Sequence, residues 1–165
     1  MKDKILVALS TFAKNGEQPI ELLEKSGIDY YINPLGRRII ADEILQMGLD
    51  ATGTIAGLEP YTKDVLSNLP NLKCISRVGV GIDNIDQGFA KKQNIVICNT
   101  PDAVIQPVAE LVLALIFDLL KKTTLHTILL KSKKWERHVG HLLFGKTVGI
   151  IGTGKIGKRV SEILT

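Results

Sequence analysis

The first 100 residues of this 165-residue chain predict an α/β fold built on a parallel sheet. Short apolar segments alternate with helical segments along this stretch, which is the pattern of strand–helix–strand units. The strand segments are apolar almost throughout, as expected of parallel strands covered on both faces. Hydrophobic residues make up 45% of the chain and charged residues 23%, so the composition is globular and a core can be buried.

Individual residues mark where several elements of this domain begin or end. Gly27 and Gly48 each end a helix, Pro34 stops a strand, and Thr62 is well placed to cap a helix. The expected strands are 5–9, 28–34, 51–57, 72–78 and 94–99. The expected helices are 19–25, 39–47, 62–68 and 85–92. Five strands with intervening helices make a complete small domain.

The character of the chain changes after about residue 100. A long apolar helix is expected over 104–122, followed by helical sequence over 124–132 and a polar loop over 133–146. A new strand is expected over 148–151, with a helix after it. We therefore predict a first domain at 1–100 and the opening of a second domain at 101–165.

A glycine-rich turn follows this last strand. Gly152 permits a tight turn, Gly154 lets a pyrophosphate approach the backbone, and Gly157 lets the helix pack closely on the strand. Lys155 and Ile156 lie between them, where the helix N-terminus offers N–H groups to phosphates. A G-x-G-x-x-G turn alone is a weak indicator, but the strand before it and the helix after it favour dinucleotide binding over a purely structural turn.

Other functional classes receive little support. The net charge of +4 is too small to indicate nucleic-acid binding, and the longest apolar stretch, 111–117, is too short to span a membrane. His138 and His141 are expected as exposed loop residues rather than metal ligands, since a third ligand is lacking. Cys74 and Cys98 are expected to be buried, reduced thiols, which suits the cytoplasm.

Five sequence blocks together resemble the D-isomer-specific 2-hydroxyacid dehydrogenases, and in particular their phosphoglycerate-dehydrogenase-like branch. The blocks are "RVGVGIDNID" (77–86), "NTP" (99–101), "VAELVLAL" (108–115), "KWER" (134–137) and "GKTVGIIGTGKIGK" (145–158). The resemblance implies a flavodoxin-like, parallel-sheet substrate domain, followed by a crossover helix and the start of a Rossmann NAD(P)-binding domain. It also implies a homodimer formed through the Rossmann domain.

The resemblance also implies which residues bind ligands. Backbone N–H groups of the loop Val78-Gly79-Val80-Gly81 would receive the substrate carboxylate, and Val80 would also touch the nicotinamide. The cofactor-binding residues would be Gly152, Gly154, Lys155, Ile156 and Gly157. The family's catalytic Arg, Glu and His lie further along the chain, so residues 1–165 alone are expected to be inactive.

The implied reaction is hydride transfer between a nicotinamide and a D-2-hydroxy acid or 2-oxo acid, with 3-phosphoglycerate as one candidate. NAD is the expected cofactor; NADP stays open, because the acidic residue that distinguishes them would lie near position 177. Two alternatives also stay open: a non-catalytic dinucleotide-sensing protein, and an inactive truncated family member.

One loop departs from the family pattern. The family commonly has N-[TA]-P-G-x-N before its crossover helix, whereas this chain has Asp102 at the glycine position and Val104 at the asparagine position. The segment 56–60 also lacks the arginine that some phosphoglycerate-specific members carry. The substrate preference is therefore less defined than the 2-hydroxyacid class.

Overall fold

A computed structural model describes residues 2–165 of the chain. The chain forms two compact units, one that extends to Pro101 and one from Asp102 to Thr165. The units are described separately below.

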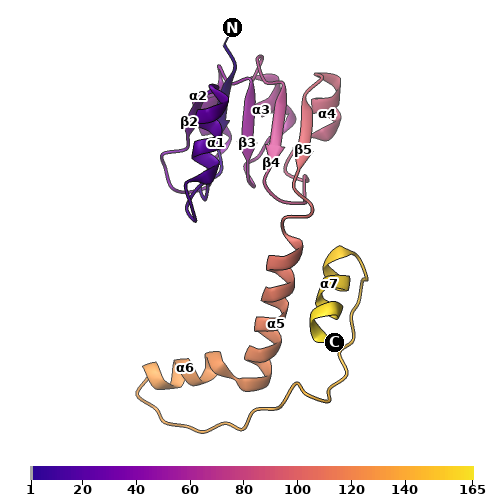
Figure 1. Cartoon of the computed structure of the whole chain (residues 1–165). Coiled ribbons are helices and arrows are strands. Elements are labelled where there is room, and N and C mark those ends of the chain that lie inside the picture. The colour runs from indigo at the N-terminus through magenta and orange to yellow at the C-terminus, as the bar shows by residue number, and fades with distance from the viewer. Residues whose placement is uncertain (1) are drawn as a thin grey trace. The chain divides into compact units, whose positions relative to one another are not determined.

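The first unit contains a five-stranded sheet in which all strands are parallel (Figure 1). The strands are β1 (Lys4–Val7), β2 (Asp29–Ile32), β3 (Gly53–Ala56), β4 (Cys74–Arg77) and β5 (Val96–Asn99). Their order in the sheet is β2-β1-β3-β4-β5, which is the flavodoxin-like order. The predicted α/β class with a parallel sheet is confirmed.

Four helices connect these strands: α1 (Gln18–Ser26), α2 (Ala41–Gly48), α3 (Lys63–Ser67) and α4 (Gln87–Lys92). The expected cap of α3 is present, because the Thr62 hydroxyl accepts a hydrogen bond from the Val65 N–H at 3.4 Å. Asp86 caps α4 in the same way, accepting from the Phe89 N–H at 2.8 Å. These side chains accept hydrogen bonds from N–H groups of the first helical turn, which have no backbone acceptor within the helix.

The core of this unit lies between the sheet and helices α2, α3 and α4. Leu6 and Ile75 of the sheet pack in one buried cluster with Ile44 and Leu66 of the helices. Val7, which alternates with Leu6 along β1, is also fully buried but lies outside this cluster. Because successive strand residues face opposite sides of a sheet, Val7 belongs to the other face.

The opposite face is less well covered toward β5, and this corrects the expectation for one cysteine. Cys74 is half-buried but Cys98 is exposed, as is Val96 on the same face of β5. β5 is an edge strand, so fewer neighbours shield it. Both thiols are free, and burial together with the neighbouring Cys98 raises the pKa of Cys74.

The second unit contains three helices: α5 (Ile105–Lys121), α6 (Thr123–Lys131) and α7 (Lys155–Leu164). α7 packs against α5. α5 and α6 meet at Lys122, whose φ of 57° breaks the helix. The Asp118 carboxylate accepts from the Thr124 N–H at 2.7 Å and so caps the start of α6.

The strand expected over 148–151 does not form, so this prediction is wrong for the present structure. A strand requires a hydrogen-bonded neighbour, and none pairs with this segment within residues 2–165. The segment remains apolar and open to solvent: Ile151 is fully exposed.

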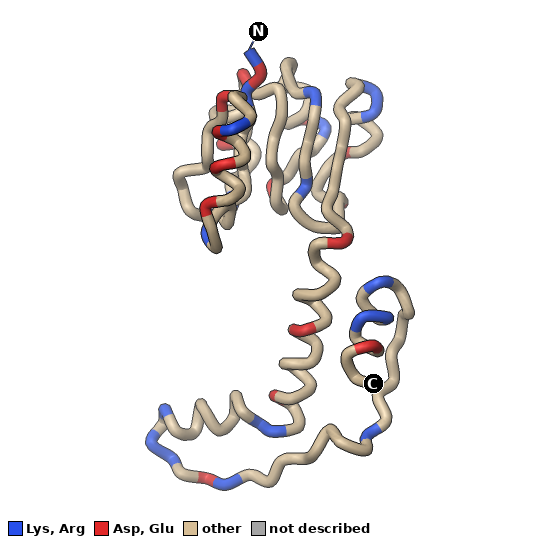
Figure 2. Tube along the Cα trace, in the orientation of Figure 1, with Lys and Arg blue, Asp and Glu red and all other residues tan. Residues whose placement is uncertain are grey.

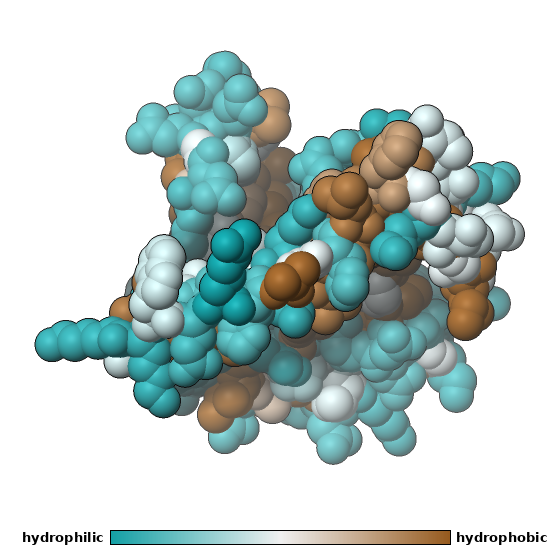
Figure 3. All heavy atoms as spheres, turned by 90° about the horizontal axis from the view of Figure 1, so that it is seen from below, coloured by the Kyte–Doolittle hydropathy of each residue, from teal (hydrophilic) through white to brown (hydrophobic). Residues whose placement is uncertain are grey.

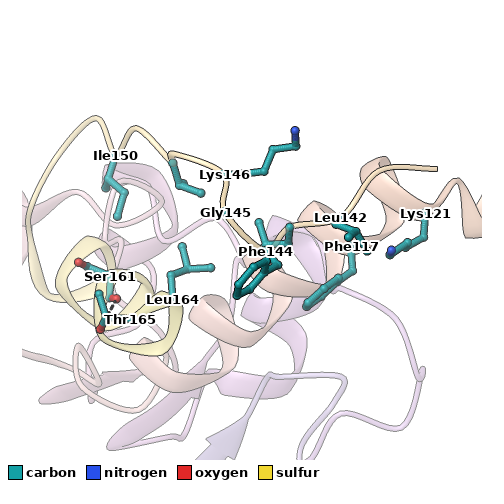
Figure 4. Close-up of a pocket in the computed structure, with 12 residues that line it drawn as sticks. Phe117, Lys121, Leu142, Phe144, Gly145, Lys146, Ile150, Ser161, Leu164 and Thr165 are labelled. Carbon is teal, nitrogen blue, oxygen red and sulfur yellow. Dashed lines mark hydrogen bonds between the residues drawn. The ribbon is translucent and has the colours of Figure 1, made fainter.

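The second unit buries little of its apolar surface. Only Ala109 and Val160 are buried within 102–165, all of which the structure describes. Hydrophobic side chains (brown) lie open among hydrophilic ones on the face drawn in Figure 3. A hollow of about 710 Å³ opens between α5, the 142–150 segment and the end of α7, with Phe117, Phe144 and Leu164 around it (Figure 4).

Among residues 2–165, no helix combines the length and the apolar character needed to cross a membrane.

Candidate functional site

The loop that follows β4 is held by the end of β5. Gly79 donates its N–H to the Thr100 hydroxyl at 2.8 Å and accepts the Thr100 N–H at 3.0 Å. The Asn99 side-chain amide donates to the Val80 carbonyl at 2.8 Å. The loop is thus fixed at the carboxyl edge of the sheet, which is where parallel α/β sheets bind ligands.

These hydrogen bonds change which N–H groups are available to a ligand. The N–H of Val78 donates to the Ala56 carbonyl at 2.8 Å, and that of Gly79 to Thr100. The N–H groups of Val80 and Gly81, both on exposed residues, meet no acceptor within the described chain. A carboxylate could use these two directly, and Gly79 only by replacing the Thr100 hydroxyl.

Gly79 is required for two physical reasons. Its φ of 130° lies in a region that other residues rarely adopt. A Cβ at this position would also collide with Nη1 of Arg77. The absence of a side chain therefore lets the loop close over the guanidinium.

Arg77 is a functional candidate that the sequence reasoning missed. Its side chain is only 8% exposed, and its Nε has no hydrogen-bond partner among the described residues. A buried, incompletely paired cation costs free energy, so it favours an anionic ligand nearby. One signal was available in the sequence: a charged residue at an inward-facing position of a predicted strand, directly before the glycine loop.

A second buried charge lies in the turn after β3. The Glu59 carboxylate is buried and accepts the Gly57 N–H at 2.5 Å. The Asn84 amide donates to the Glu59 carbonyl at 2.7 Å, which ties this turn to the segment that carries the glycine loop. Burial raises the pKa of the neighbouring Tyr61 phenol, which hydrogen-bonds Thr54 at 2.7 Å. These contacts brace the carboxyl edge of the sheet.

The glycine turn in the second unit leads directly into helix α7. Gly152 has a φ of 93°, and Gly154 caps the N-terminus of α7 with open space where a Cβ would stand. A Cβ at Gly157 would collide with the Gly152 carbonyl oxygen. The side of Gly154 is therefore open next to the first N–H groups of α7, as the predicted cofactor site requires.

The first turns of α7 are basic. Lys155, Lys158 and Arg159 lie within its first five residues, and Figure 2 shows this end of α7 in blue. Positive side chains are unfavourable at a helix N-terminus unless an anion is nearby. In this structure Asp102 supplies one negative charge, with its Oδ1 2.5 Å from the Lys155 Nζ.

Each unit therefore gathers its own part of the expected site. Val78, Gly79 and Val80 lie together in the first unit, and the glycine turn with Lys155 and Ile156 lies in the second. No three His, Cys, Asp or Glu side chains come together as a metal site within the described part of the chain. His141 is exposed as expected, whereas His138 is half-buried. The rings of His138 and His126 pack edge-on, with 5.8 Å between their centroids.

Comparison with known proteins connects these features to one family. The model of the D-isomer-specific 2-hydroxyacid dehydrogenase catalytic domain matches residues 8–162. Hydroxypyruvate reductase of Thermotoga maritima is 42% identical over 103 residues, which is 61% of this chain and 34% of that protein. Human D-3-phosphoglycerate dehydrogenase is 33% identical over 156 residues, which is 84% of this chain and 29% of that enzyme.

A solved structure shows the same fold. The NAD⁺-bound 3-phosphoglycerate dehydrogenase of Entamoeba histolytica superimposes with a TM-score of 0.80 and 30% identity. The match covers 99% of this chain and 51% of that one. The match thus spans about a third of the length of the Thermotoga protein and about half of the length of the Entamoeba protein.

Proposed function

Since the chain belongs to the D-isomer-specific 2-hydroxyacid dehydrogenase family, we propose that it supplies the substrate loop and the cofactor turn of an NAD(P)-dependent oxidoreductase. The reaction is hydride transfer between a nicotinamide and the C2 atom of a D-2-hydroxy acid or 2-oxo acid. The observation that carries this proposal is the glycine turn, whose open side at Gly154 and basic helix N-terminus suit a dinucleotide.

The residues of the chain take distinct roles. Gly152, Gly154 and Gly157, with the backbone of Lys155 and Ile156, bind the pyrophosphate. The loop from Val78 to Gly81 orients the substrate carboxylate through the N–H groups of Val80 and Gly81, which meet no acceptor within the described chain, and the Val80 side chain contacts the nicotinamide. The bound cofactor supplies the hydride acceptor or donor.

Arg77 bears on the substrate class. Its buried guanidinium lies beside the loop and favours a substrate that carries negative charge. Such a charge is the acid's own carboxylate or a second anionic group, as in a phosphorylated hydroxy acid. The side chains that hold the carboxylate and exchange the proton in catalysis are expected outside residues 1–165, and the isolated chain is expected to bind NAD without turnover.

The assembly and the cellular location are part of the same proposal. A homodimer formed through the second unit is supported by its exposed apolar side chains, such as Leu115, Leu119 and Ile128. A cytoplasmic location is supported by the two free thiols.

Dinucleotide binding by the chain tests this proposal. Gly154→Val fills the space over the turn, so we expect it to abolish NADH binding measured by saturation-transfer NMR. Gly149→Val is the matched control, because a Cβ at Gly149 meets nothing within 4 Å and the residue lies before the turn. Binding that survives Gly154→Val would contradict the proposed cofactor site. Binding without turnover in a chain with the complete cofactor domain would favour a dinucleotide sensor.

A further inference from the structure

The two cysteines of the chain lie on one face of the neighbouring strands β4 and β5 (Figure 1). Cys74 stands directly opposite Val96 in the sheet, and Cys98 stands opposite Ser76. Because every second residue of a strand points to the same side, these four side chains share one face. The two thiols are therefore diagonal neighbours. Their closeness agrees with the raised pKa of Cys74, which is caused by burial and then by Cys98.

Both thiols are free, and an ion can reach them from solvent. Cys98 is exposed on the edge strand β5, and Cys74 is half-buried. The core formed with α2, α3 and α4 lies on the opposite face of the sheet, where Ile75 of β4 is buried. The thiol pair thus belongs to an accessible surface and not to the packed core.

The spacing of the pair does not suit a disulfide. Neighbouring strands lie about 4.8 Å apart and alternate residues of a strand about 6.6 Å apart, so diagonal Cα atoms are separated by about 8 Å. A disulfide needs Cα atoms within about 7 Å. Two opposed metal–sulfur bonds of about 2.3 Å hold their sulfurs about 4.6 Å apart. Two thiols that lean toward each other across this diagonal reach that separation.

The available ligands select the kind of metal. Thiolates are soft ligands that suit Cu(I), whereas Zn(II) takes three or four protein ligands. No group of three His, Cys, Asp or Glu residues that could hold a metal occurs among residues 2–165, so the pair has no third ligand of these types there. Ser76 and Val96, which complete this part of the face, are poor ligands for either ion.

We propose that Cys74 and Cys98 form a two-coordinate dithiolate site for one Cu(I) ion. The ion links β4 to β5, the two strands that hold the glycine loop. Asn99, the neighbour of Cys98, donates to the Val80 carbonyl at 2.8 Å, and β4 ends at Arg77 directly before the loop. Because the ion binds the folded sheet, it stabilises the first unit by mass action.

Anaerobic competition with bicinchoninate measures Cu(I) binding to the 165-residue chain. We expect one ion per chain. Cys74→Ser and Cys98→Ser should each lower the affinity by more than about 100-fold, since loss of an outer-shell partner alone costs about 10- to 100-fold. Cu(I) should raise the unfolding temperature of the unmodified chain and not that of the serine variants. Zn(II) should cause no such rise, because its further ligands are missing.

Met47→Leu is the matched control, because it removes a sulfur atom from helix α2 and leaves both thiols in place. Its Cu(I) affinity should equal that of the unmodified chain. Circular dichroism of the serine variants should also be unchanged, which separates a lost ligand from a lost fold.

A double variant tests the spacing itself. Cys74→Ser with Ser76→Cys moves one thiol directly opposite Cys98, where the Cα atoms are about 4.8 Å apart. This variant should form a disulfide in oxidised glutathione, whereas the unmodified chain should keep two free thiols.

Three results would overturn the proposed site. The first is a serine variant that binds Cu(I) as tightly as the unmodified chain. The second is Zn(II) binding of similar strength, and the third is a Cys74–Cys98 disulfide in the unmodified chain. None of them bears on dinucleotide binding, which is tested separately at Gly154.

Discussion

Gly79 and Gly157 each allow two parts of the chain to approach closely. At Gly79 the neighbour is the Arg77 guanidinium, and at Gly157 it is the Gly152 carbonyl. The predicted reason for Gly157 is close packing of the helix on the strand at 148–151; that strand does not form, and the neighbour of Gly157 is the turn itself. The reason for Gly79 was not visible in the sequence, because it depends on where the Arg77 side chain lies.

The first prediction concerns Arg77. The substitution Arg77→Met removes a cation beside the substrate loop. In a chain that includes the complete cofactor domain, KM for an anionic 2-oxo acid should therefore rise at least tenfold. Folding stability should change little or improve, because the buried Nε has no partner to lose. Steady-state kinetics and thermal unfolding measure the two effects.

The control for Arg77 is Arg38→Met, which removes an exposed arginine with the same change in net charge. Its KM should match that of the unmodified enzyme. An unchanged KM in Arg77→Met would show that the guanidinium only fills space beneath the loop.

At the scale of elements, the helices and strands of the first unit follow the sequence closely. Strands β2 to β5 lie inside their predicted ranges but are shorter, as β2 shows, with Asp29–Ile32 inside the predicted 28–34. β1 begins at Lys4, one residue before the predicted 5–9, and ends two residues early. Apolar patterning predicts which residues can form a strand, whereas the ladder of backbone hydrogen bonds decides how far the strand extends. The failed strand at 148–151 is the extreme case, because its ladder has no partner in the described chain.

Helix α2 carries a pH-dependent prediction. The Glu43 carboxylate accepts from the Ile40 N–H at 2.9 Å and pairs with Arg37 at 2.5 Å. The Arg37 hydrogen bond, followed by that of the Ile40 N–H, lowers the pKa of Glu43 from 4.5 to about 2. A group with a lowered folded-state pKa stabilises the fold above its unfolded pKa and loses this effect as pH falls.

We therefore expect Glu43→Gln to unfold at a lower urea concentration than the unmodified chain at pH 7. The difference should shrink as pH falls from about 4.5 toward about 2 and be lost below that, where Glu43 is protonated in both states. Asp42→Asn removes a charge from the same helical turn and serves as the comparison. A Glu43→Gln deficit that kept its full size as pH fell to about 2 and below would assign it to altered packing instead of the ionised cap.

At the scale of the whole molecule, the division into two units leads to the last prediction. The main buried cluster draws every member from the first unit, from Leu6 to Ile95, whereas the second unit buries only Ala109 and Val160. Residues 1–101 should therefore fold alone, with far-UV circular dichroism and hydrogen-exchange protection in β1, β3 and β4 equal to those in the 165-residue chain.

This prediction also tests the domain boundary near residue 100. If residues 1–101 lost protection in the sheet, the second unit would have to contribute to the stability of the first. A single cooperative transition of the 165-residue chain, absent from the shorter one, would give the same conclusion.

The sequence by itself determined the α/β class, the order of elements in the first unit, the helix cap at Thr62, and the spacing of the glycine turn. These depend on local patterns, because apolar periodicity, capping side chains and glycine spacing act over a few residues. Only the tertiary structure decided the strand order, the exposure of Cys98, the burial of Arg77 under Gly79, and the Asp102–Lys155 pair. Each of these depends on which distant segments meet, and that is fixed by sheet pairing and helix packing and cannot be read from neighbours along the chain.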